Sequence, residues 1–490
     1  MIPLTVAEIA SITGGTIAVG LVVPDSASGS GTTERPANEA AAATSVTGPV
    51  VIDSRQAVPG ALFAALPGEH ADGHDYAAAA AGKGAAAILA ARPLPAAGVP
   101  VIVVADVTVA LGLLARAVLG RLPEAIVVGI TGSSGKTSTK DLTAQVVERL
   151  GATIAPEGSL NNEIGLPLTV LRADETTRYL ILEMSARGIG HIAYLTGIAP
   201  PRIGAVLNVG RAHAGEFGSV AAVAKAKGEL VEALPAAADG GVAVLNADDP
   251  NVAAMAARTS ARVLTTSVDP GREADVRAAD ISLDDLGRAS FVLCAGGTTA
   301  NVKLRLHGRH HVANALAAAA VAAELGMDVT AIADALSAAT ARSKKRMELT
   351  RRADGVLVVN DAYNANPDST RAAIEALAHL AGNGRRAIAV LGYMAELGDI
   401  EEQSHEEAGR LAARAGAAIV VAVGAGAAPV LDGARAASGW QGEAIAVPDP
   451  KSAVAALQNR LRPGDVVLVK ASKSAGLWEV ADGLLAEDDQ

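Results

Sequence analysis

The chain has 490 residues, of which 50% are hydrophobic and 2% aromatic, so it is long enough for about three domains with cores of alanine, valine and leucine. Its formal net charge of −11 and the lack of a basic tail or stripe argue against nucleic-acid binding, and no apolar run reaches the ~20 residues of a membrane span. Cys294 is the single cysteine and rules out a disulfide framework, and the N-terminus lacks the pattern of a signal peptide, so a cytoplasmic protein is expected.

Residues 1–108 are expected to form a small N-terminal α/β domain. Residues 25–47 are rich in Ser, Thr, Gly, Ala and Pro, a composition typical of a flexible surface insertion. Short apolar runs bounded by turn residues predict strands within residues 50–68, 86–90 and 99–104. Alternation of these strands with a helix near residues 76–83 indicates the α/β class.

Ala125–Leu150 is the stretch around which the chain is organised. A β-branched run is followed by small residues and then, from Lys136, by a helical pattern. Strand, glycine loop and helix form the arrangement in which backbone N–H groups hold nucleotide phosphates. The pattern present is T-G-x-x-G-K-[ST] rather than the strict G-x-x-x-x-G-K-[ST]. The predicted ATP-binding residues of this loop are Gly132, Ser133, Ser134, Gly135, Lys136, Thr137 and Ser138. Lys136 is expected on the β- and γ-phosphates and the Thr137 hydroxyl on Mg²⁺.

Residues 109–342 are expected to form a central ATP-binding domain with a parallel sheet. Strands are predicted near residues 179–183, 203–209 and 241–245, and such sheets build their sites at the strands' carboxyl ends. Glu183 ends the first of these strands and can hold Mg²⁺, although a purely structural glutamate is equally expected there. His213 follows the next strand and is either a metal ligand or an exposed loop histidine.

Residues 343–490 predict a third, Rossmann-like α/β domain, which the run SKKRMEL at 343–349 connects to the second. The turn NDAYNANPDS follows its first predicted strand and offers side chains suited to a ribose or an amine, namely Asp361, Asn364 and Asn366, or it is simply a polar turn. Lys470 ends a later strand. Arg346 in the connecting run can reach a γ-phosphate as an arginine finger does, or is an exposed linker charge.

Together, several segments resemble the Mur ligase family. In chain order they are TGSSGKT at 131–137, SLNNEIGLPLT at 159–169, ILEMSARGIGHIAYL at 181–195, NVGRAHAGEFGSVAAVAKAKGEL at 208–230, GRHHVANALAA at 308–318, DAYNANPDS at 361–369 and YMAELGD at 393–399. LNNEIG, AKAKGE, DAYNANP and MAELG are far more specific than a phosphate loop. The resemblance runs from about residue 5 to 480, apart from residues 25–47.

This resemblance implies a three-domain enzyme that joins D-Ala-D-Ala to UDP-N-acetylmuramoyl-tripeptide, with ATP and Mg²⁺. In the family, ATP phosphorylates the terminal carboxylate of the tripeptide, and the dipeptide amine then attacks the acyl phosphate. Bound Mg²⁺ and a lysine neutralise charge on the transferring phosphoryl group. The first domain is expected to bind the UDP-muramoyl peptide and the third D-Ala-D-Ala, in a protein expected to be a monomer.

The resemblance also implies roles for individual residues. Lys136 matches the phosphate lysine, Thr137 and Glu183 match Mg²⁺ ligands, and His213 matches a ligand of the second Mg²⁺. Family members often carry a carbamylated lysine after that histidine, for which Lys227 fits best and Lys225 is the second choice.

Further roles follow from the other motifs. Asn314 matches an adenine-contacting asparagine, Arg346 the γ-phosphate arginine and Asp361 a ribose carboxylate. The expected substrate-binding residues are Asn161 and Asn162 on the muramoyl-peptide side, Asp53, Ser54 and Arg55 in the first domain, and Asn364, Asn366 and Lys470 in the third. His311 and Tyr393 depart from the family's usual GRHN and GDM.

Two alternatives stay open at this point. A sister Mur ligase or a folylpolyglutamate-type ligase would use the same phosphate chemistry, although the diamino-acid-adding sister usually carries an Asp-Asn-Pro-Arg segment that this chain lacks. A nucleotide switch that is not a ligase would show no substrate-stimulated turnover. The ligase mechanism requires domain closure, so we expect an unliganded form with Arg346 and Asp361 far from Lys136.

Overall fold

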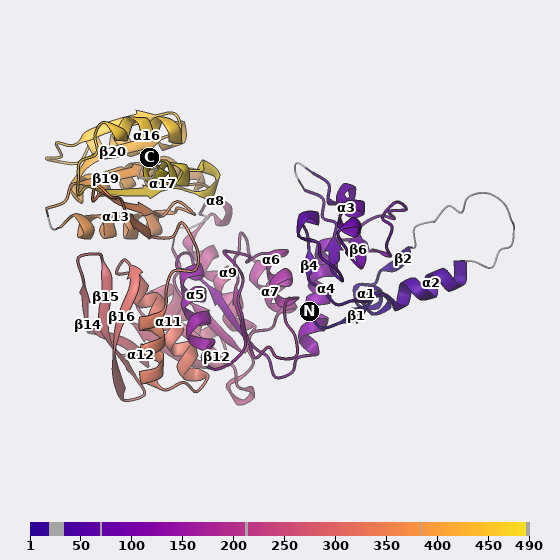
Figure 1. The fold of residues 1–490 in the computed structure, drawn as a ribbon. Helices are drawn as coiled ribbons and strands as arrows, with labels where there is room; N and C mark the ends of the chain where they lie inside the picture. Colours follow the sequence, from indigo (N-terminus) through magenta and orange to yellow (C-terminus); the bar gives the residue numbers. More distant parts are fainter. Residues whose placement is uncertain (19–33, 69–70, 211–213, 383, 487–490) are drawn as a thin grey trace. The chain divides into compact units, whose positions relative to one another are not determined.

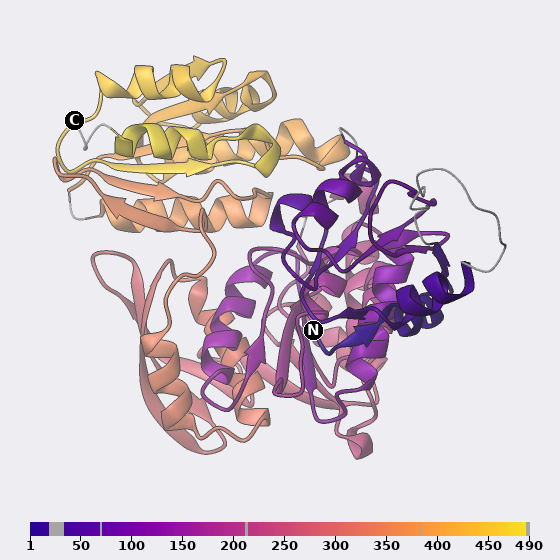
Figure 2. The same cartoon turned by 45° about the vertical axis from the view of Figure 1, so that its right-hand side comes forward.

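The computed structural model describes residues 1–18, 34–68, 71–210, 214–382 and 384–486. By its contacts the chain divides into two compact units. One unit comprises residues 1–128, 151–184 and 193–201, and the other comprises residues 129–150, 185–192 and 202–490. Strands and helices alternate along most of the chain (Figures 1 and 2). No helix among the described residues is long and apolar enough to cross a membrane.

The first unit begins with a five-stranded sheet in the order β2-β7-β6-β5-β4. Strands β4 to β7 pair in parallel and β2 pairs antiparallel with β7. One face is closed by a buried cluster that includes Phe63 and Ile88. The elements are β1 Leu4–Thr5, α1 Val6–Thr13, β2 Thr16–Ala18, α2 Glu34–Ala43, β3 Ser45–Val46, β4 Val50–Val51, β5 Leu62–Ala64, α3 Ala77–Gly82, β6 Ala87–Ala90, β7 Val101–Val103 and α4 Val107–Gly120.

The described part of the predicted insertion at residues 25–47 contains a helix and a short strand. Residues 34–43 form helix α2, and β3 after it pairs antiparallel with β1. Four consecutive alanines, Ala40–Ala43, end this helix, and alanine has the highest helix propensity of any residue. The prediction counted these alanines only as part of a Ser, Thr, Gly, Ala and Pro composition, and a flexible surface insertion at residues 25–47 stays a prediction. Residues 25–33 lie outside the described residues.

A nine-stranded sheet has the strand order β16-β15-β14-β13-β12-β11-β8-β10-β9. Strands β11 to β14 pair in parallel, and β14, β15 and β16 form an antiparallel meander. Residues 262–307 therefore consist mostly of strands. The elements are β8 Ile126–Thr131, α5 Lys136–Val147, β9 Thr153–Ile154, α6 Gly165–Val170, β10 Tyr179–Glu183, α7 His191–Ile198, β11 Ile203–Val206, α8 Ala214–Phe217, α9 Val220–Glu232, β12 Val242–Asn246, α10 Pro250–Ala253, β13 Arg262–Ser267, β14 Val276–Leu283, β15 Arg288–Ala295, β16 Thr298–His307, α11 His311–Glu324 and α12 Val329–Ala338.

The last part of the second unit contains a six-stranded sheet in the order β17-β18-β22-β19-β20-β21. Along β18, Leu357 and Val359 enter one buried cluster and Val358 enters the other, so both faces are covered, as a parallel sheet requires. The strand predicted before the turn NDAYNANPDS and the strand predicted to end at Lys470 are present as β18 and β22, whereas the antiparallel edge strand β17 and the other edge strand β21 were not predicted. The elements are β17 Glu348–Arg351, β18 Leu357–Asn360, α13 Pro367–Ala381, β19 Ala387–Leu391, α14 Glu401–Arg414, β20 Ala417–Val423, α15 Pro429–Arg435, β21 Glu443–Val447, α16 Pro450–Gln458, β22 Val466–Lys470 and α17 Trp478–Leu485.

We predict that Phe63→Ala lowers the free energy of unfolding by about 3–5 kcal/mol, because it opens a cavity in the first sheet's core. Phe63 is 0% exposed, whereas Tyr76 in the same unit is 47% exposed. Urea unfolding followed by circular dichroism measures the change, with Tyr76→Ala as the control. Equal, small shifts in both variants would contradict the assigned core.

Candidate active site

The phosphate loop follows β8 and ends where α5 begins. Gly135 stands at the N-cap of α5 with φ +79°, a left-handed conformation that favours glycine, and no side chain caps this helix start. A Cβ atom at Gly132 would lie 3.0 Å from the Leu207 Cβ and 3.2 Å from the Ser134 carbonyl oxygen. Gly135 is therefore favoured by its backbone conformation, and Gly132 leaves little room for a side chain. An uncapped helix start behind a glycine loop suits a phosphate group.

Asn208 braces the loop and was not among the predicted site residues. Its Oδ1 accepts a hydrogen bond from the Ser134 N–H at 2.9 Å, and its Nδ2 donates to the Ser134 carbonyl at 3.2 Å. Next to it, the Gly210 N–H donates to the Ser133 hydroxyl at 2.8 Å. The segment NVGRAH contains both bracing residues, but His213 was its only predicted site residue.

Two lysines lie close to this loop. Lys136 Nζ donates to the Gly132 carbonyl at 2.8 Å, so its ammonium group folds over the loop. Lys227, on α9, is only 2% exposed, and burial together with the nearby Lys136 charge lowers the pKa of its amine well below the usual range. Lys225 is exposed on the same helix. Lys227 is thus the buried lysine of the two, and its carbamylation stays a prediction.

Two of the predicted Mg²⁺ ligands, Thr137 and Glu183, belong to different compact units. The Thr137 hydroxyl lies on the first turn of α5, and its residue is buried. Glu183 ends β10, is buried, and accepts a hydrogen bond from Asn161 Nδ2 at 2.6 Å. Hydroxyl and carboxylate oxygens are the donors that Mg²⁺ prefers, so both residues fit the ion. No cluster of three or more metal-binding His, Cys, Asp or Glu side chains occurs among the described residues, which exclude His213.

Asn314 lies beneath the phosphate loop. Its Oδ1 is so close to Gly135 that a Cβ atom there would stand 2.6 Å away. Its Nδ2 approaches His311 Nδ1 at 3.3 Å, and because the amide nitrogen only donates, Nδ1 acts as the acceptor. Burial lowers the pKa of His311 well below its usual range, so the ring is neutral. An adenine contact of Asn314 stays a prediction.

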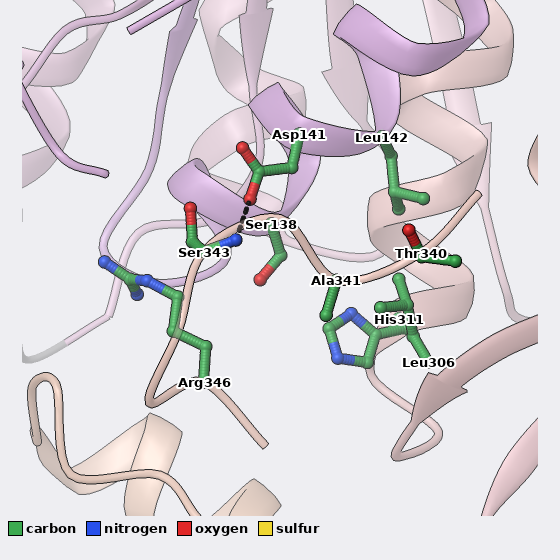
Figure 3. Close-up of a pocket in the computed structure, with 9 residues that line it drawn as sticks. All are labelled: Ser138, Asp141, Leu142, Leu306, His311, Thr340, Ala341, Ser343 and Arg346. Atoms are coloured by element: carbon green, nitrogen blue, oxygen red, sulfur yellow. Dashed lines mark hydrogen bonds between the residues drawn. The ribbon is translucent and has the colours of Figure 1, made fainter. Parts of the chain in front are cut away.

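Arg346 lines a pocket beside α5 (Figure 3). The pocket is lined by Ser138, Asp141, Leu142, Leu306, His311, Thr340, Ala341, Ser343 and Arg346. Ser138 is only two residues beyond Lys136, so the expectation of an Arg346 far from the phosphate loop is wrong. The connecting run is held here because the Ser343 N–H donates to Asp141 Oδ2 at 3.1 Å, as Figure 3 shows.

Asp361 and Lys470 form an ion pair in the third sheet. Lys470 Nζ lies 2.6 Å from Asp361 Oδ2 and donates to the Asn364 carbonyl at 3.0 Å. Asp361 Oδ1 accepts from the Met347 N–H at 3.0 Å. These three predicted residues are therefore brought together, but by contacts with each other and with the linker. Their contacts with ribose or dipeptide stay predictions.

The other predicted residues also have local partners. Asn366 caps α13, and its Nδ2 donates to the Ser133 carbonyl at 3.4 Å, which links the third sheet's turn to the phosphate loop. Asn162 Oδ1 accepts from the Gly165 N–H. In the first sheet, Ser54 and Arg55 form a short turn with Asp53, and the Arg55 side chain and N–H lower the pKa of Asp53 to about 2. Their contacts with substrate stay predictions.

Comparisons with known proteins cover nearly the whole chain. Residues 49–118 match the model described as Mur ligase family, catalytic domain, residues 130–322 match the Mur ligase middle domain, and residues 345–473 match the Mur ligase, glutamate ligase domain. A Mycobacterium tuberculosis protein named UDP-N-acetylmuramoyl-tripeptide–D-alanyl-D-alanine ligase is 49% identical, over 100% of this chain and 99% of its own.

Solved structures agree with these matches. The crystal structure of MurF from Acinetobacter baumannii superposes with a TM-score of 0.83 at 29% identity, over 99% of both chains. The MurF ligase of Thermotoga maritima in complex with ADP gives a TM-score of 0.77 at 29% identity, over 91% of this chain and 98% of that one. The expected three-domain α/β fold is therefore confirmed.

We predict that Gly135→Ala abolishes ATP binding without unfolding the protein. The left-handed φ costs a non-glycine residue ~1–2 kcal/mol, and the added methyl group meets Asn314 Oδ1. Calorimetric titration with ATP and Mg²⁺ measures the loss. Gly158→Ala is the control, since Gly158 also has a positive φ but nothing lies within 4 Å of its added Cβ. ATP binding by Gly135→Ala with unchanged affinity would contradict the assigned loop geometry.

Proposed function

The chain belongs to the Mur ligase family, and we infer from this that it is an ATP-dependent ligase joining D-Ala-D-Ala to UDP-N-acetylmuramoyl-tripeptide in peptidoglycan synthesis. The observation that carries this inference is the 49% identity along its full length to a protein of that name. The phosphate loop supports this inference, because Gly135 has a left-handed φ of +79° at a helix start that no side chain caps, an arrangement suited to a phosphate group. ATP use is further supported by the ADP complex of the related Thermotoga maritima enzyme.

The reaction chemistry explains why ATP is required. A carboxylate is a poor electrophile, and transfer of the γ-phosphoryl group to one of its oxygens creates a good leaving group. The amine of D-Ala-D-Ala then attacks the carbonyl carbon, the C–O bond to phosphate breaks, and inorganic phosphate leaves as the amide forms. We assign Lys136 and Arg346 to the charge on the transferred group and Asn314 to the nucleoside, whereas the Asp361 carboxylate is already held by Lys470 and the Met347 N–H.

Mg²⁺ would be held by Thr137 and Glu183, with His213 as a further ligand, and would supply charge neutralisation at the phosphates. Glu183 is oriented for this by the Asn161 amide. Such an orienting hydrogen bond fixes which carboxylate oxygen faces a metal ion. On this assignment, Asn161 acts through Glu183 as well as on the muramoyl peptide.

Lys227 has the properties that carbamylation needs. A neutral amine attacks CO₂ and loses one proton, which yields a carbamate with a negative charge. Burial of Lys227 keeps its amine neutral, and the nearby Lys136 ammonium attracts the charge that forms. We propose that Lys227 is carbamylated in the active enzyme.

The remaining substrate contacts follow the domains. We propose that Asp53, Ser54 and Arg55, with Asn161 and Asn162, serve the UDP-muramoyl peptide, and that Asn364, Asn366 and Lys470 serve D-Ala-D-Ala. A monomer working in the cytoplasm is the simplest form of the proposal, and the single cysteine agrees with a reducing compartment.

We predict ATP-dependent phosphate release with UDP-muramoyl-tripeptide and D-Ala-D-Ala, abolished by Lys136→Ala. A coupled phosphate assay measures it, and UDP-muramoyl-dipeptide with a diamino acid is the comparison pair. Phosphate release with the second pair alone would show that the chain is a sister ligase. Release with neither pair, despite ATP binding, would favour the nucleotide switch.

Carbamylation of Lys227 predicts a ¹³C resonance in the carbamate region when the protein is equilibrated with ¹³C-bicarbonate. The resonance should vanish in Lys227→Met and persist in Lys225→Met, since Lys225 is exposed. Activity should fall on removal of CO₂ and return on its addition. An unlabelled Lys227 in a fully active enzyme would contradict this assignment.

A further inference from the structure

The backbone on both sides of Arg346 is strained. Of the four non-glycine residues with positive φ in the described ranges, two are its immediate neighbours, Lys345 at φ +61° and Met347 at φ +50°. A positive φ brings the Cβ atom close to the carbonyl oxygen, so residues with a side chain rarely adopt this left-handed conformation. Such residues persist only where surrounding contacts hold them, and they cluster at functional sites.

The Met347 side of the strained segment is held by a buried charge. The Met347 N–H donates to Asp361 Oδ1 at 3.0 Å, and Asp361 Oδ2 lies 2.6 Å from Lys470 Nζ. The Lys470 side chain is 2% exposed and also donates to the Asn364 carbonyl. Because Lys470 fixes the carboxylate and the carboxylate fixes the linker amide, the two residues act as one support.

The Lys345 side is held by backbone and ring contacts. The Lys345 N–H donates to Glu348 Oε2 at 2.9 Å, and its carbonyl accepts from the Tyr363 N–H at 3.1 Å. Lys345 Nζ lies 3.9 Å from the centre of the Trp478 ring. The Arg346 guanidinium itself lies 4.3 Å from the centre of the Tyr363 ring, a cation–π contact that fixes its direction.

The preceding part of the linker is fastened to α5, the helix that begins at the phosphate loop. Gln145 exchanges hydrogen bonds with the backbone of Thr340, and the Ser343 N–H donates to Asp141. Arg342 pairs with Glu148 at 2.5 Å. The chain is thus held by contacts on both sides of Arg346, and the Arg346 side chain lines the pocket that contains Ser138.

We propose that Asp361, Lys470 and Tyr363 are positioning residues, which hold the strained linker so that Arg346 faces the pocket beside the phosphate loop. The proposal deepens the proposed function and rests on it, because Arg346 is the group assigned to the γ-phosphate. In this proposal the Asp361 carboxylate holds the linker and does not contact the ribose. The strain at Lys345 and Met347 is offset by these contacts and keeps the guanidinium in one orientation.

A double-mutant cycle tests the proposal through turnover. Asp361→Asn and Tyr363→Leu should each lower kcat by ~10-fold or more, with the KM for ATP changed by less than ~3-fold. In an Arg346→Ala background the same substitutions should change kcat by less than ~2-fold, because the group they position is gone. Tyr363→Phe keeps the ring and should restore most of the kcat that Tyr363→Leu loses. Lys344→Ala, an exposed linker position, is the matched control.

The contrary outcomes are distinct. Equal losses of kcat in both backgrounds, or a loss confined to the KM for ATP, would overturn positioning and assign Asp361 to direct nucleotide binding. If the wild-type protein shows no substrate-dependent phosphate release, the proposed function fails. The positioning role of Asp361 is then tested by amide hydrogen exchange in residues 343–349. If residues 343–349 exchange faster in Asp361→Asn than in Lys344→Ala, Asp361 holds this segment in place. Equal exchange in the two variants would refute that role.

Discussion

Positive charge gathers at the start of α5, and the rest of the site is arranged around it. The helix N-terminus contributes a partial positive charge, Lys136 adds a full one over the loop, and Lys227 lies buried nearby. Burial first, and the nearby Lys136 ammonium group second, lower the pKa of the Lys227 amine. An anion relieves the imbalance. The triphosphate of ATP is such an anion, and a carbamate on Lys227 would be another, so both parts of the proposed chemistry arise from one electrostatic constraint.

The third sheet is coupled to this centre through short contacts. Asn366 spans from the cap of α13 to the Ser133 carbonyl, and the linker bearing Arg346 is fastened to α5 on one side and to Asp361 on the other. A phosphate bound in the loop can therefore affect the turn at residues 360–366 through a direct contact, without a long-range pathway.

The sequence predicted the phosphate loop because the spacing of its glycines and Lys136 is set by local backbone geometry. It also predicted the strand ends that carry Glu183 and Asp361, since apolar runs mark buried strands. Burial of Lys227 could not be predicted, because lysine is normally solvated and only tertiary packing covers this one. The positive φ values at Lys345 and Met347 leave no trace in the sequence, since neither residue is glycine or asparagine. The helix at residues 34–43 was missed because composition was given more weight than its run of alanines.

The most direct test of the central claim follows an oxygen atom. UDP-muramoyl-tripeptide carrying ¹⁸O in its terminal carboxylate is incubated with ATP, D-Ala-D-Ala and Mg²⁺, and the released phosphate is examined by mass spectrometry. If the carboxylate attacks the γ-phosphorus and the acyl phosphate is then aminolysed, each phosphate carries one oxygen from the peptide. Phosphate that contains only oxygen from ATP and water would show that no acyl phosphate forms, and it would contradict the account.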